Sequence, residues 1–450
     1  MSSKHFIDDP EHLVNSALNA ITLTNPGVGI DSLNKIVYVR PRHEPTQQKV
    51  AIISGGGSGH EPAFASMVGP GMLSAAVVGH IFASPNAEQV RTAIMSRVSH
   101  NDCAKQKANA YDEGVLLVIM NYTGDVLSFG VAVEKARAAG INVEMVVVGD
   151  DVAIGRSKAG KVGRRGIAGT VLVQKLSGAL AAMGYGIRQV TELARLFADN
   201  VASIGASLEH VHVPGLTKNS TKGLAELRAG EVEIGMGIHN EQGTDRVKAT
   251  LPELIENMLA QLLKQSDPDR SFVDFSQCST NIVLLVNNLG GLSTLELAGI
   301  TNEVVLQLDK AYNIQPLRVL SGTYMTSLNA PGFSISLLRI IDTGIDAVSM
   351  LDLLDYPCEV SGWTCPIKRT TWEAKDLGVR DSEVSTLSDE PRSNLIIDVN
   401  LFQEALTTGL ENLIAAEPLI THYDTIVGDG DCGVCLKRGA RGNLSRFYDC

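Results

Sequence analysis

The sequence lacks the features that place a chain in a membrane or outside the cell. Its 450 residues contain no apolar run near the ~20 uncharged residues that a membrane-spanning helix needs. The opening segment, MSSKHFIDDPEH, has no apolar core, so we expect no signal peptide. The seven cysteines are an odd number scattered along a long chain, which predicts reduced thiols and a cytoplasmic location.

Positive charge is also scarce. The chain has 38 basic and 50 acidic residues, a net charge of −12, and no run of Lys or Arg. Such a surface repels nucleic acid and anionic lipid, so we expect neither as a partner. The expected ligand is a small neutral molecule or a nucleotide neutralised by a divalent cation. Glycine, by contrast, is abundant at 43 residues, which suits an α/β protein with tight turns around a small polar ligand.

Short apolar runs that end in glycine or polar residues alternate with helix-length segments. The runs at 50–57, 114–125 and 142–151 suit strands that are buried on both faces of a parallel sheet. Further along we predict a helix over 191–208, strands over 209–215, 281–291 and 322–340, and helices near 251–264 and 293–313. This alternation predicts a wound α/β fold.

The pattern changes after residue 354. Residues 355–393 hold three prolines and both tryptophans among polar side chains, which indicates a linker. One amphipathic helix follows, with Phe402, Leu406 and Leu410 on its apolar face, and after it a DTIVGDGD loop and a featureless basic tail. One helix cannot bury its apolar face alone. Either it docks on the rest of the chain, or the domain that it begins is incomplete.

A glycine-rich loop, GGGSGHEP at 55–62, follows the first predicted strand. It is not a Walker loop, because no Lys-Ser/Thr follows, and it does not fit the dinucleotide pattern. Its glycines allow a ligand to approach the backbone, so the loop could form a glycine cradle that presents Ser58, His60 and Glu61. A tight turn whose histidine caps a helix is the alternative, and a glycine loop alone does not decide between them.

A second loop, NYTGDVLSFG at 121–130, also follows an apolar run. Ligands of open α/β sheets lie beyond the carboxyl ends of the strands, so we expect Asp125 and His60 to face one crevice. A carboxylate beside an imidazole can remove a hydroxyl proton. The alternative is that Asp125 is the N-cap of a helix that begins near Val126.

A third segment, EIGMGIHNEQG at 233–243, places His239 in a loop with glycines on both sides. An accessible loop position suits a nucleophile, although a loop histidine with no role is the alternative. His210 and His212 could bind a metal from one face of a strand. No third ligand is in view, and we assign these two histidines no role.

Three aspartates, Asp424, Asp429 and Asp431, lie within eight positions on a loop that contains two glycines. Carboxylates this close repel one another unless a hard cation bridges them, and Mg²⁺ holding nucleotide phosphates is the natural candidate. The spacing is not that of an EF-hand, because no Glu occupies its terminal position. A solvated acidic turn is the alternative.

Taken together, GGGSGHEPA, NYTGDVLSFG, GRRGIAGTVLV, GMGIHNE, VNNLGGLS and GDGDCG resemble, in order, the motifs of the dihydroxyacetone kinase family. The resemblance implies an α/β ketose-binding domain in two halves (1–195 and 196–354), a linker (355–393), and the first helix and metal loop of an all-helical nucleotide domain (394–450). It also implies a homodimeric transferase of glycerol metabolism that uses ATP and Mg²⁺ to phosphorylate dihydroxyacetone, or glyceraldehyde in related members.

The resemblance implies roles for single residues as well. His239 matches the histidine that adds to the substrate carbonyl as a hemiaminal. Such a bond distinguishes a short ketose from glycerol, which has the same hydroxyls and no carbonyl. The remaining matches are His60 and Asp125 for the pair that orients and deprotonates the accepting hydroxyl, Gly57, Ser58 and Gly59 for the substrate cradle, and Asp424, Asp429 and Asp431 for the Mg²⁺–ATP ligands.

The sequence departs from the family pattern in two places. Met120 occupies the position of a family lysine that contacts the substrate, so an apolar thioether replaces a point charge. The match also fades at about Arg441, although the family's nucleotide domain continues for many helices. We therefore expect an incomplete nucleotide domain. Two functions stay open, an ATP-dependent kinase and a module that binds dihydroxyacetone without turnover; phosphate hydrolysis at the aspartates has little support, because that loop lacks a general base.

Overall fold

The structure is a computed structural model that describes residues 5–40, 48–98, 113–215, 227–276, 281–364, 367–373, 396, 398–428 and 430–448. The chain divides into two compact units, Met1–Lys375 and Asp376–Cys450. Across the described ranges, no helix is both long enough and apolar enough to cross a membrane.

The first sheet of the larger unit is mostly parallel. Its strands in the described ranges are β1 (Val28–Asp31), β2 (Ile36–Val39), β3 (Val50–Ser58), β4 (Ala75–Ile81), β5 (Gly114–Met120) and β6 (Val143–Val148). They lie in the order β1-β2-β4-β3-β5-β6, with antiparallel pairing of β1 to β2 and of β2 to β4 and parallel pairing elsewhere. Every residue of β3 and β5 is buried, as the apolar runs predict.

The second sheet is mostly antiparallel. Its strands in the described ranges are β7 (Val201–Ser207), β8 (Val232–Ile234), β9 (Asp245–Val247), β10 (Ile282–Asn288), β11 (Arg318–Gly322) and β12 (Gly332–Arg339). They lie in the order β11-β10-β12-β7-β8-β9, and only β10 and β11 pair in parallel among these strands. The predicted α/β fold class is confirmed, whereas the boundary predicted at residue 195 stays a prediction.

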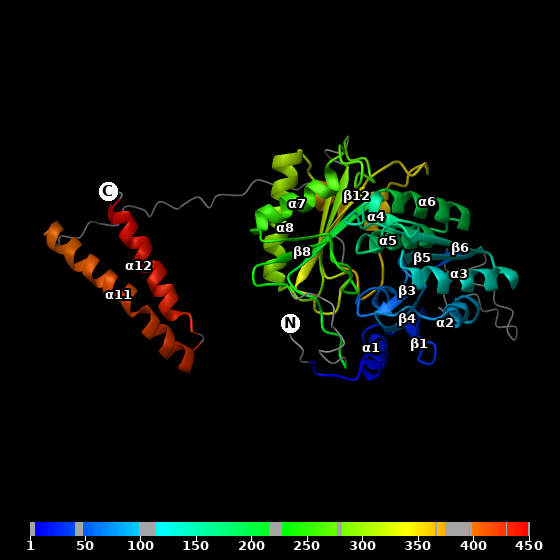
Figure 1. The fold of residues 1–450 in the computed structure, drawn as a ribbon, viewed down its shortest axis with the longest axis horizontal. Coiled ribbons are helices and arrows are strands. Elements are labelled where there is room, and N and C mark those ends of the chain that lie inside the picture. Colours follow the sequence, from blue (N-terminus) through cyan, green and yellow to red (C-terminus); the bar gives the residue numbers. More distant parts are fainter. Residues whose placement is uncertain are drawn as a thin grey trace. The chain divides into compact units, whose positions relative to one another are not determined.

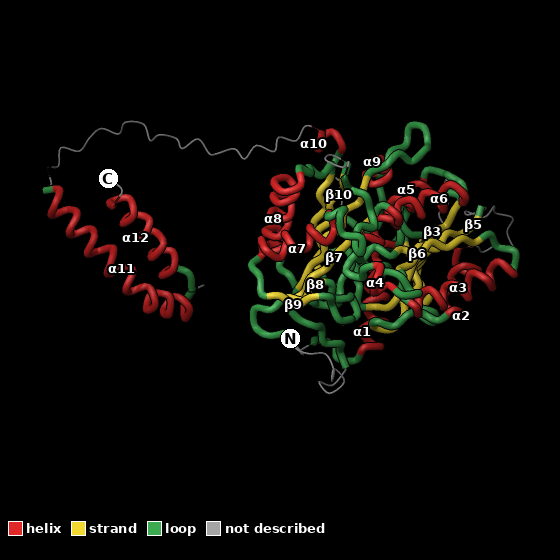
Figure 2. Tube along the Cα trace, turned by 45° about the horizontal axis from the view of Figure 1, so that its top comes forward, coloured by secondary structure: helices red, strands yellow, loops and turns green. Residues whose placement is uncertain are grey.

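Helices and sheets alternate in layers (Figures 1 and 2). The outer face of the first sheet packs against α2 (Ala87–Thr92) and α3 (Thr123–Ala138), and the outer face of the second against α7 (Leu251–Leu263) and α8 (Thr294–Tyr312). Between the sheets lies α5 (Gly169–Ala182), with α6 (Ile187–Asp199) packed beside it. Neighbouring residues of one strand therefore enter different cores, as Ile52 and Ile53 of β3 do.

The remaining elements of the larger unit are shorter or peripheral. They are α1 (Pro10–Thr24), a 3₁₀ turn (Ala65–Met67), a π turn (Ala93–Val98), α4 (Arg156–Ala159), α9 (Met350–Asp355) and α10 (Arg369–Glu373).

The central helix α5 joins the two sheets. Its residues 169–181 are all buried, because strands cover it from both sides. Two of its polar side chains are paired: Gln174 donates to Ser54 Oγ at 2.8 Å, and Lys175 Nζ donates to the carbonyls of Leu353 and Tyr356 at 2.9 and 2.8 Å. Burial lowers the pKa of Lys175 to about 8. Through Lys175 the helix also fixes the segment that follows the second sheet.

Two predicted elements of the larger unit are wrong. The helix predicted over 191–208 ends at Asp199, and Val201–Ser207 is β7. Val201 packs in the core between the sheets and Ile204 in the core under α7 and α8, so burial on both faces of a sheet outweighs the helical spacing of the apolar residues. The strand predicted over 209–215 is irregular backbone.

The smaller unit contains two helices in its described part, α11 (Val399–Val427) and α12 (Cys432–Tyr448), which pack against each other. The prediction of a featureless tail is therefore wrong. Gly433 allows the helices to approach closely, because a Cβ there would lie 2.5 Å from the Glu417 carbonyl oxygen. Lys437 Nζ contacts Glu417 Oε2 at 2.8 Å, which adds an ion pair between the two helices.

Candidate functional site

Two histidines from different sheets meet in the larger unit. His60 follows β3, His239 lies in the loop between β8 and β9, and their Nε2 atoms are 2.9 Å apart. The rings are nearly perpendicular, at 81°, with centroids 4.7 Å apart. His60 is fully buried, whereas the His239 side chain keeps 18% of its surface exposed. His239 is thus the partner that a small ligand can reach.

The orientation of His60 is set by its other ring nitrogen. Nδ1 lies 2.8 Å from the carbonyl oxygen of Thr326, which can only accept, so Nδ1 donates and carries a proton. The ring of Phe82 stacks on His60 at 5.3 Å. Burial, followed by the charge of His239, lowers the pKa of His60 to about 3. At neutral pH His60 is therefore neutral, with an acceptor lone pair on Nε2.

Glu241 orients His239. Its Oε1 accepts from Nδ1 of His239 at 3.0 Å and its Oε2 from the backbone N–H of His239 at 2.9 Å. Burial opposes ionisation of Glu241, but the hydrogen bonds from His239 outweigh it and lower the pKa of Glu241 to about 2. Glu241 is therefore a carboxylate at neutral pH, and Nδ1 of His239 is protonated.

These hydrogen bonds leave the two Nε2 atoms facing each other. Both Nδ1 atoms donate, so the Nε2–Nε2 contact needs one further proton. His60 does not hold it, given its low pKa. The two rings can therefore share a proton only through their Nε2 atoms, and the carboxylate of Glu241 lies on the far side of the His239 ring.

The His239 loop is held by polar contacts from two other segments. The Asn240 amide pairs with the backbone of Val211, accepting at 2.9 Å and donating at 3.0 Å, and Ser327 Oγ donates to the Ile238 carbonyl at 2.6 Å. The segment that contains His210 and His212 thus supports this loop. In the described part of the chain, no three His, Cys, Asp or Glu side chains lie close enough to share a metal ion.

Asp125 lies in the first turn of α3, which begins at Thr123 after the N-cap Tyr122. The alternative of an N-cap Asp125 is therefore wrong. Asp125 is 3% exposed, and its Oδ1 has no hydrogen-bond partner among the described residues. Burial raises the pKa of Asp125 to about 6, against a hydrogen bond from Ser84 and the charge of His239. A buried carboxylate with a free oxygen suits the acceptance of a hydroxyl proton.

Asp125 and His60 are not hydrogen-bonded to each other within the described chain. Asp125 instead faces the glycine segment of β3, since a Cβ built on Gly56 would lie 3.6 Å from its Oδ2. The side chain of Met120 is buried beside the same glycine, with its Cε 3.8 Å from that Cβ. The contact that the structure makes directly is the one between His60 and His239.

Packing inside the protein accounts for part of the glycine cradle. A Cβ on Gly57 would lie 2.7 Å from the backbone nitrogen of Ala83, and one on Gly59, which has φ +98°, would lie 2.8 Å from the ring of Phe82. Ser58 Oγ donates to the Gly79 carbonyl at 2.8 Å. The roles predicted for Gly57, Ser58 and Gly59 in substrate binding stay predictions.

The acidic loop of the smaller unit is described only in part, because Asp429 lies outside the described residues. Asp424 is in the last turn of α11, where its Oδ2 accepts from the backbone N–H of Cys432 at 3.0 Å. Asp431 directly precedes α12. Their carboxylate oxygens are the donor type that Mg²⁺ prefers. The donor chemistry fits this cation, and the predicted three-aspartate ligand set stays a prediction.

Sequence reasoning missed several residues of the site. Glu241 stands two positions from His239 in the same motif, but that spacing carries no periodic signal. The rings of Phe82 and Tyr122 meet His239 edge-on at 5.3 and 4.5 Å and come from segments far away in the sequence. Tyr122 also has a buried hydroxyl without a partner in the described chain.

The fold and the site together define an α/β protein with a histidine-centred site at the junction of two sheets. A family model for the Dak1 domain matches residues 19–362. The chain is 40% identical over 455 residues to dihydroxyacetone kinase of Pichia angusta, covering 99% of this chain and 72% of that one. It is 41% identical over 457 residues to dihydroxyacetone kinase 1 of Saccharomyces cerevisiae, covering 98% and 73%.

A solved structure has a similar fold. The dihydroxyacetone kinase from C. freundii, in complex with AMP-PNP and Mg²⁺, matches with a TM-score of 0.69 and 30% identity over 100% of this chain and 75% of that one. The chain belongs to the dihydroxyacetone kinase family of enzymes. The resemblance seen in the motifs is thereby confirmed.

Proposed function

We propose that this protein phosphorylates dihydroxyacetone with ATP and holds the ketose as a hemiaminal on His239. The observation that carries the proposal is the geometry of His239, whose Nδ1 is bound by Glu241 while its Nε2 lies 2.9 Å from His60. Similarity to fungal dihydroxyacetone kinases supports the reaction, and a relative that binds AMP-PNP and Mg²⁺ supports the nucleotide and the metal.

Addition of the ketose begins with the proton on Nε2 of His239. His60 accepts this proton on its own Nε2, which frees the His239 lone pair to attack the carbonyl carbon. The carbonyl oxygen then takes the proton from His60 and becomes a hydroxyl. The net charge of the two histidines and the ketose stays at +1: it moves to His60 with the proton and returns to the His239 ring in the hemiaminal, where Glu241 balances it. The low pKa of His60 makes it a weak base that returns the proton readily.

The covalent step selects a carbonyl compound. Glycerol offers the same hydroxyls without a carbonyl, so it cannot form the bond to His239. Glyceraldehyde can, and we propose it as a second substrate. Asp125 would then accept the proton of the terminal hydroxyl as that oxygen attacks the γ-phosphorus of ATP, the bond to the bridging oxygen breaks and ADP leaves. Burial raises the pKa of Asp125 to about 6, which makes its carboxylate a stronger base than that of an exposed aspartate.

Asp424, Asp429 and Asp431 are the residues that we propose to hold Mg²⁺. When bound, the ion neutralises phosphate charge on the nucleotide. The homodimer implied by the family resemblance belongs to the same proposal, and sedimentation velocity would test it.

A coupled assay of the 450-residue chain with ATP, Mg²⁺ and dihydroxyacetone tests the reaction. We expect ADP and dihydroxyacetone phosphate at rates of about 1–100 s⁻¹, as is typical of kinases. Binding of the ketose without product would overturn the kinase and leave the binding module. Absence of both binding and product would overturn both functions.

Intact-mass spectrometry tests the covalent bond. The sample is kept at low temperature and no borohydride is added. We expect a dihydroxyacetone adduct on the native chain and none on His239→Ala. His12→Ala is the matched control, because His12 is exposed on α1 outside the site, and it should keep the adduct. An adduct on His239→Ala would refute the role of His239.

A further inference from the structure

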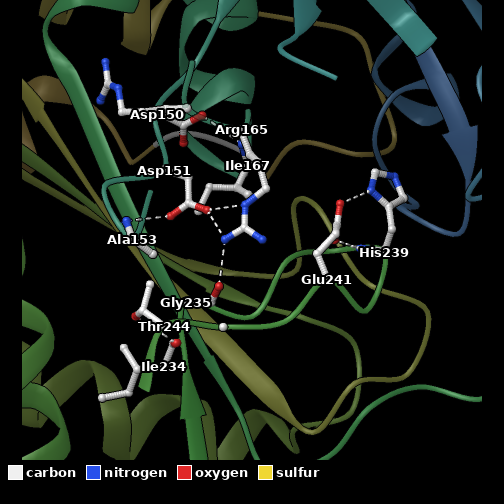
Figure 3. A network of polar contacts seen from close by, with 12 residues as sticks. Asp150, Asp151, Ala153, Arg165, Ile167, Ile234, Gly235, His239, Glu241 and Thr244 are labelled. Atoms are coloured by element: carbon white, nitrogen blue, oxygen red, sulfur yellow. Dashed lines mark hydrogen bonds and ion pairs between the residues drawn. The ribbon is translucent and has the colours of Figure 1, made fainter. Parts of the chain in front are cut away.

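A buried arginine connects the segment that follows β6 to the His239 loop (Figure 3). Arg165 lies between β6 and α5, and its side chain is 12% exposed. Its Nε donates to Oδ2 of Asp151 at 2.8 Å, and its Nη2 contacts the same oxygen at 2.6 Å. Nη2 also donates to the carbonyl oxygen of Gly235 at 2.7 Å. One guanidinium therefore holds the carboxylate of Asp151, which follows β6, and the backbone where the His239 loop begins.

Asp151 gives Arg165 a fixed anchor. Its side chain is 2% exposed, its Oδ1 accepts from the backbone N–H of Ala153 at 3.0 Å, and its own N–H donates to the Arg165 carbonyl at 3.0 Å. Asp151 also forms a parallel β-bridge with Ser203 of β7. Asp151 is thus fixed by its own backbone hydrogen bonds and by the bridge to the second sheet.

Arg165 also lies behind the carboxylate that orients His239. A Cβ built on Gly237 would lie 2.6 Å from Nη1 of Arg165 and would overlap Oε2 of Glu241, so both groups pack against the same α-carbon. Burial opposes ionisation of Arg165, but the charge of Asp151, followed by those of Tyr122 and Glu241, outweighs it and raises the pKa of Arg165 above the ordinary value. The guanidinium is therefore charged and close to Glu241.

We propose that Arg165 is a positioning residue for His239. Held by Asp151, it fixes the Gly235 carbonyl and fills the space behind Glu241, so that Glu241 keeps the His239 ring directed at His60. The role needs the planar fork of arginine, which engages a carboxylate and a carbonyl at once; a lysine ammonium offers a point charge on a flexible stem. The inference rests on the proposed function only for the identity of the ligand, dihydroxyacetone.

A purely structural role for this ion pair is the competing explanation, and the chain offers a matched control. Arg318 contacts Asp355 through Nε at 3.2 Å and Nη2 at 2.7 Å, with side-chain exposures of 6% and 19%. This pair ties β11 to the end of α9, and within the described part of the chain it forms no hydrogen bond or ion pair with the His239 loop. Breaking either pair leaves a buried charge and destabilises the fold.

The first experiment compares Arg165→Met, Arg165→Lys and Arg318→Met. We expect both methionine variants to lose stability in urea, but only Arg165→Met to lose affinity for dihydroxyacetone in calorimetry, by about 100-fold, as a small misplacement of a reacting group can cause. Arg165→Lys should recover little of the affinity. Equal affinity of Arg165→Met and the native chain would overturn the inference.

A double-mutant cycle separates positioning from general stability. If Arg165 acts through Glu241, the affinity of the Arg165→Met, Glu241→Gln double variant should be no lower than that of Glu241→Gln alone. Additive losses would show that Arg165 acts independently of Glu241 and would refute the role. A native chain that binds the ketose without turnover would contradict the proposed function and leave this cycle intact, because its readout is binding.

A third measurement needs no ligand. The Nδ1 proton of His239, assigned with His239→Ala, reports its hydrogen bond to Glu241 in the NMR spectrum of ¹⁵N-histidine-labelled protein. We expect this signal to shift or vanish in Arg165→Met and to stay in Arg318→Met. An unchanged signal in Arg165→Met would overturn the inference even if the native chain bound no ketose.

Discussion

Replacing Asp125 by Asn should stabilise the protein at neutral pH and weaken it as an enzyme. Asp125 is 3% exposed, and burial raises its pKa from 3.8 to about 6. The folded state therefore holds the carboxyl proton more tightly than the unfolded state does. Stability falls as the pH rises from about 4 to about 6, and the penalty is complete above that range.

The magnitude follows from the two pKa values. A difference between 3.8 and about 6 corresponds to a penalty of about 3 kcal/mol at pH 7.5 and about 1 kcal/mol at pH 4.5. An amide does not titrate. The free energy of unfolding of Asp125→Asn minus that of the native chain should therefore be about 2 kcal/mol larger at pH 7.5 than at pH 4.5. Effects of the amide that do not depend on pH cancel in this difference.

Urea unfolding followed by tryptophan fluorescence measures the effect. Trp363 and Trp372 are the two tryptophans of the chain, and both belong to the unit Met1–Lys375, so the signal reports the unit that contains Asp125. Asp346→Asn changes an exposed aspartate and should show no pH-dependent gain. An equal or smaller gain at pH 7.5 than at pH 4.5 would refute the conclusion that Asp125 is a buried carboxylate. Turnover of Asp125→Asn should fall by about 10²–10⁴-fold, as loss of a general base predicts.

Three further changes test other parts of the site. Glu241→Gln should lower kcat/KM by about 100-fold, because the charge on the His239 ring loses its counter-ion; an unchanged steady-state rate would contradict this. Gly237→Ala should destabilise the protein by about 1–3 kcal/mol in urea, because its Cβ would overlap Glu241 and Arg165, whereas Gly299→Ala, with no atom within 4 Å of the new Cβ, should not. Chelation of Mg²⁺ with EDTA should stop phosphorylation and leave the dihydroxyacetone adduct in the mass spectrum, and loss of the adduct would place a metal at the ketose.

The sheet of the first half of the chain was predictable, because its strands are buried on both faces and therefore appear as continuous apolar runs. The run at 50–57 is β3 and the run at 142–151 contains β6. The stretch 191–208 was not predictable in the same way. Its apolar spacing suits a helix throughout, and only the burial of β7 between two cores decides that the helix ends at Asp199.

Within the site, the sequence by itself determined which residues are available and where they stand relative to the strands. His60, Asp125 and His239 all follow or join strands of the two sheets, as their motifs indicate. The tertiary structure alone decided their partners. His60 and His239 are 179 positions apart, and Arg165 lies 70 positions from the carbonyl that it holds. Hydrogen bonds across such separations have no period in the sequence, because they depend on how two sheets pack around α5 and not on the local backbone.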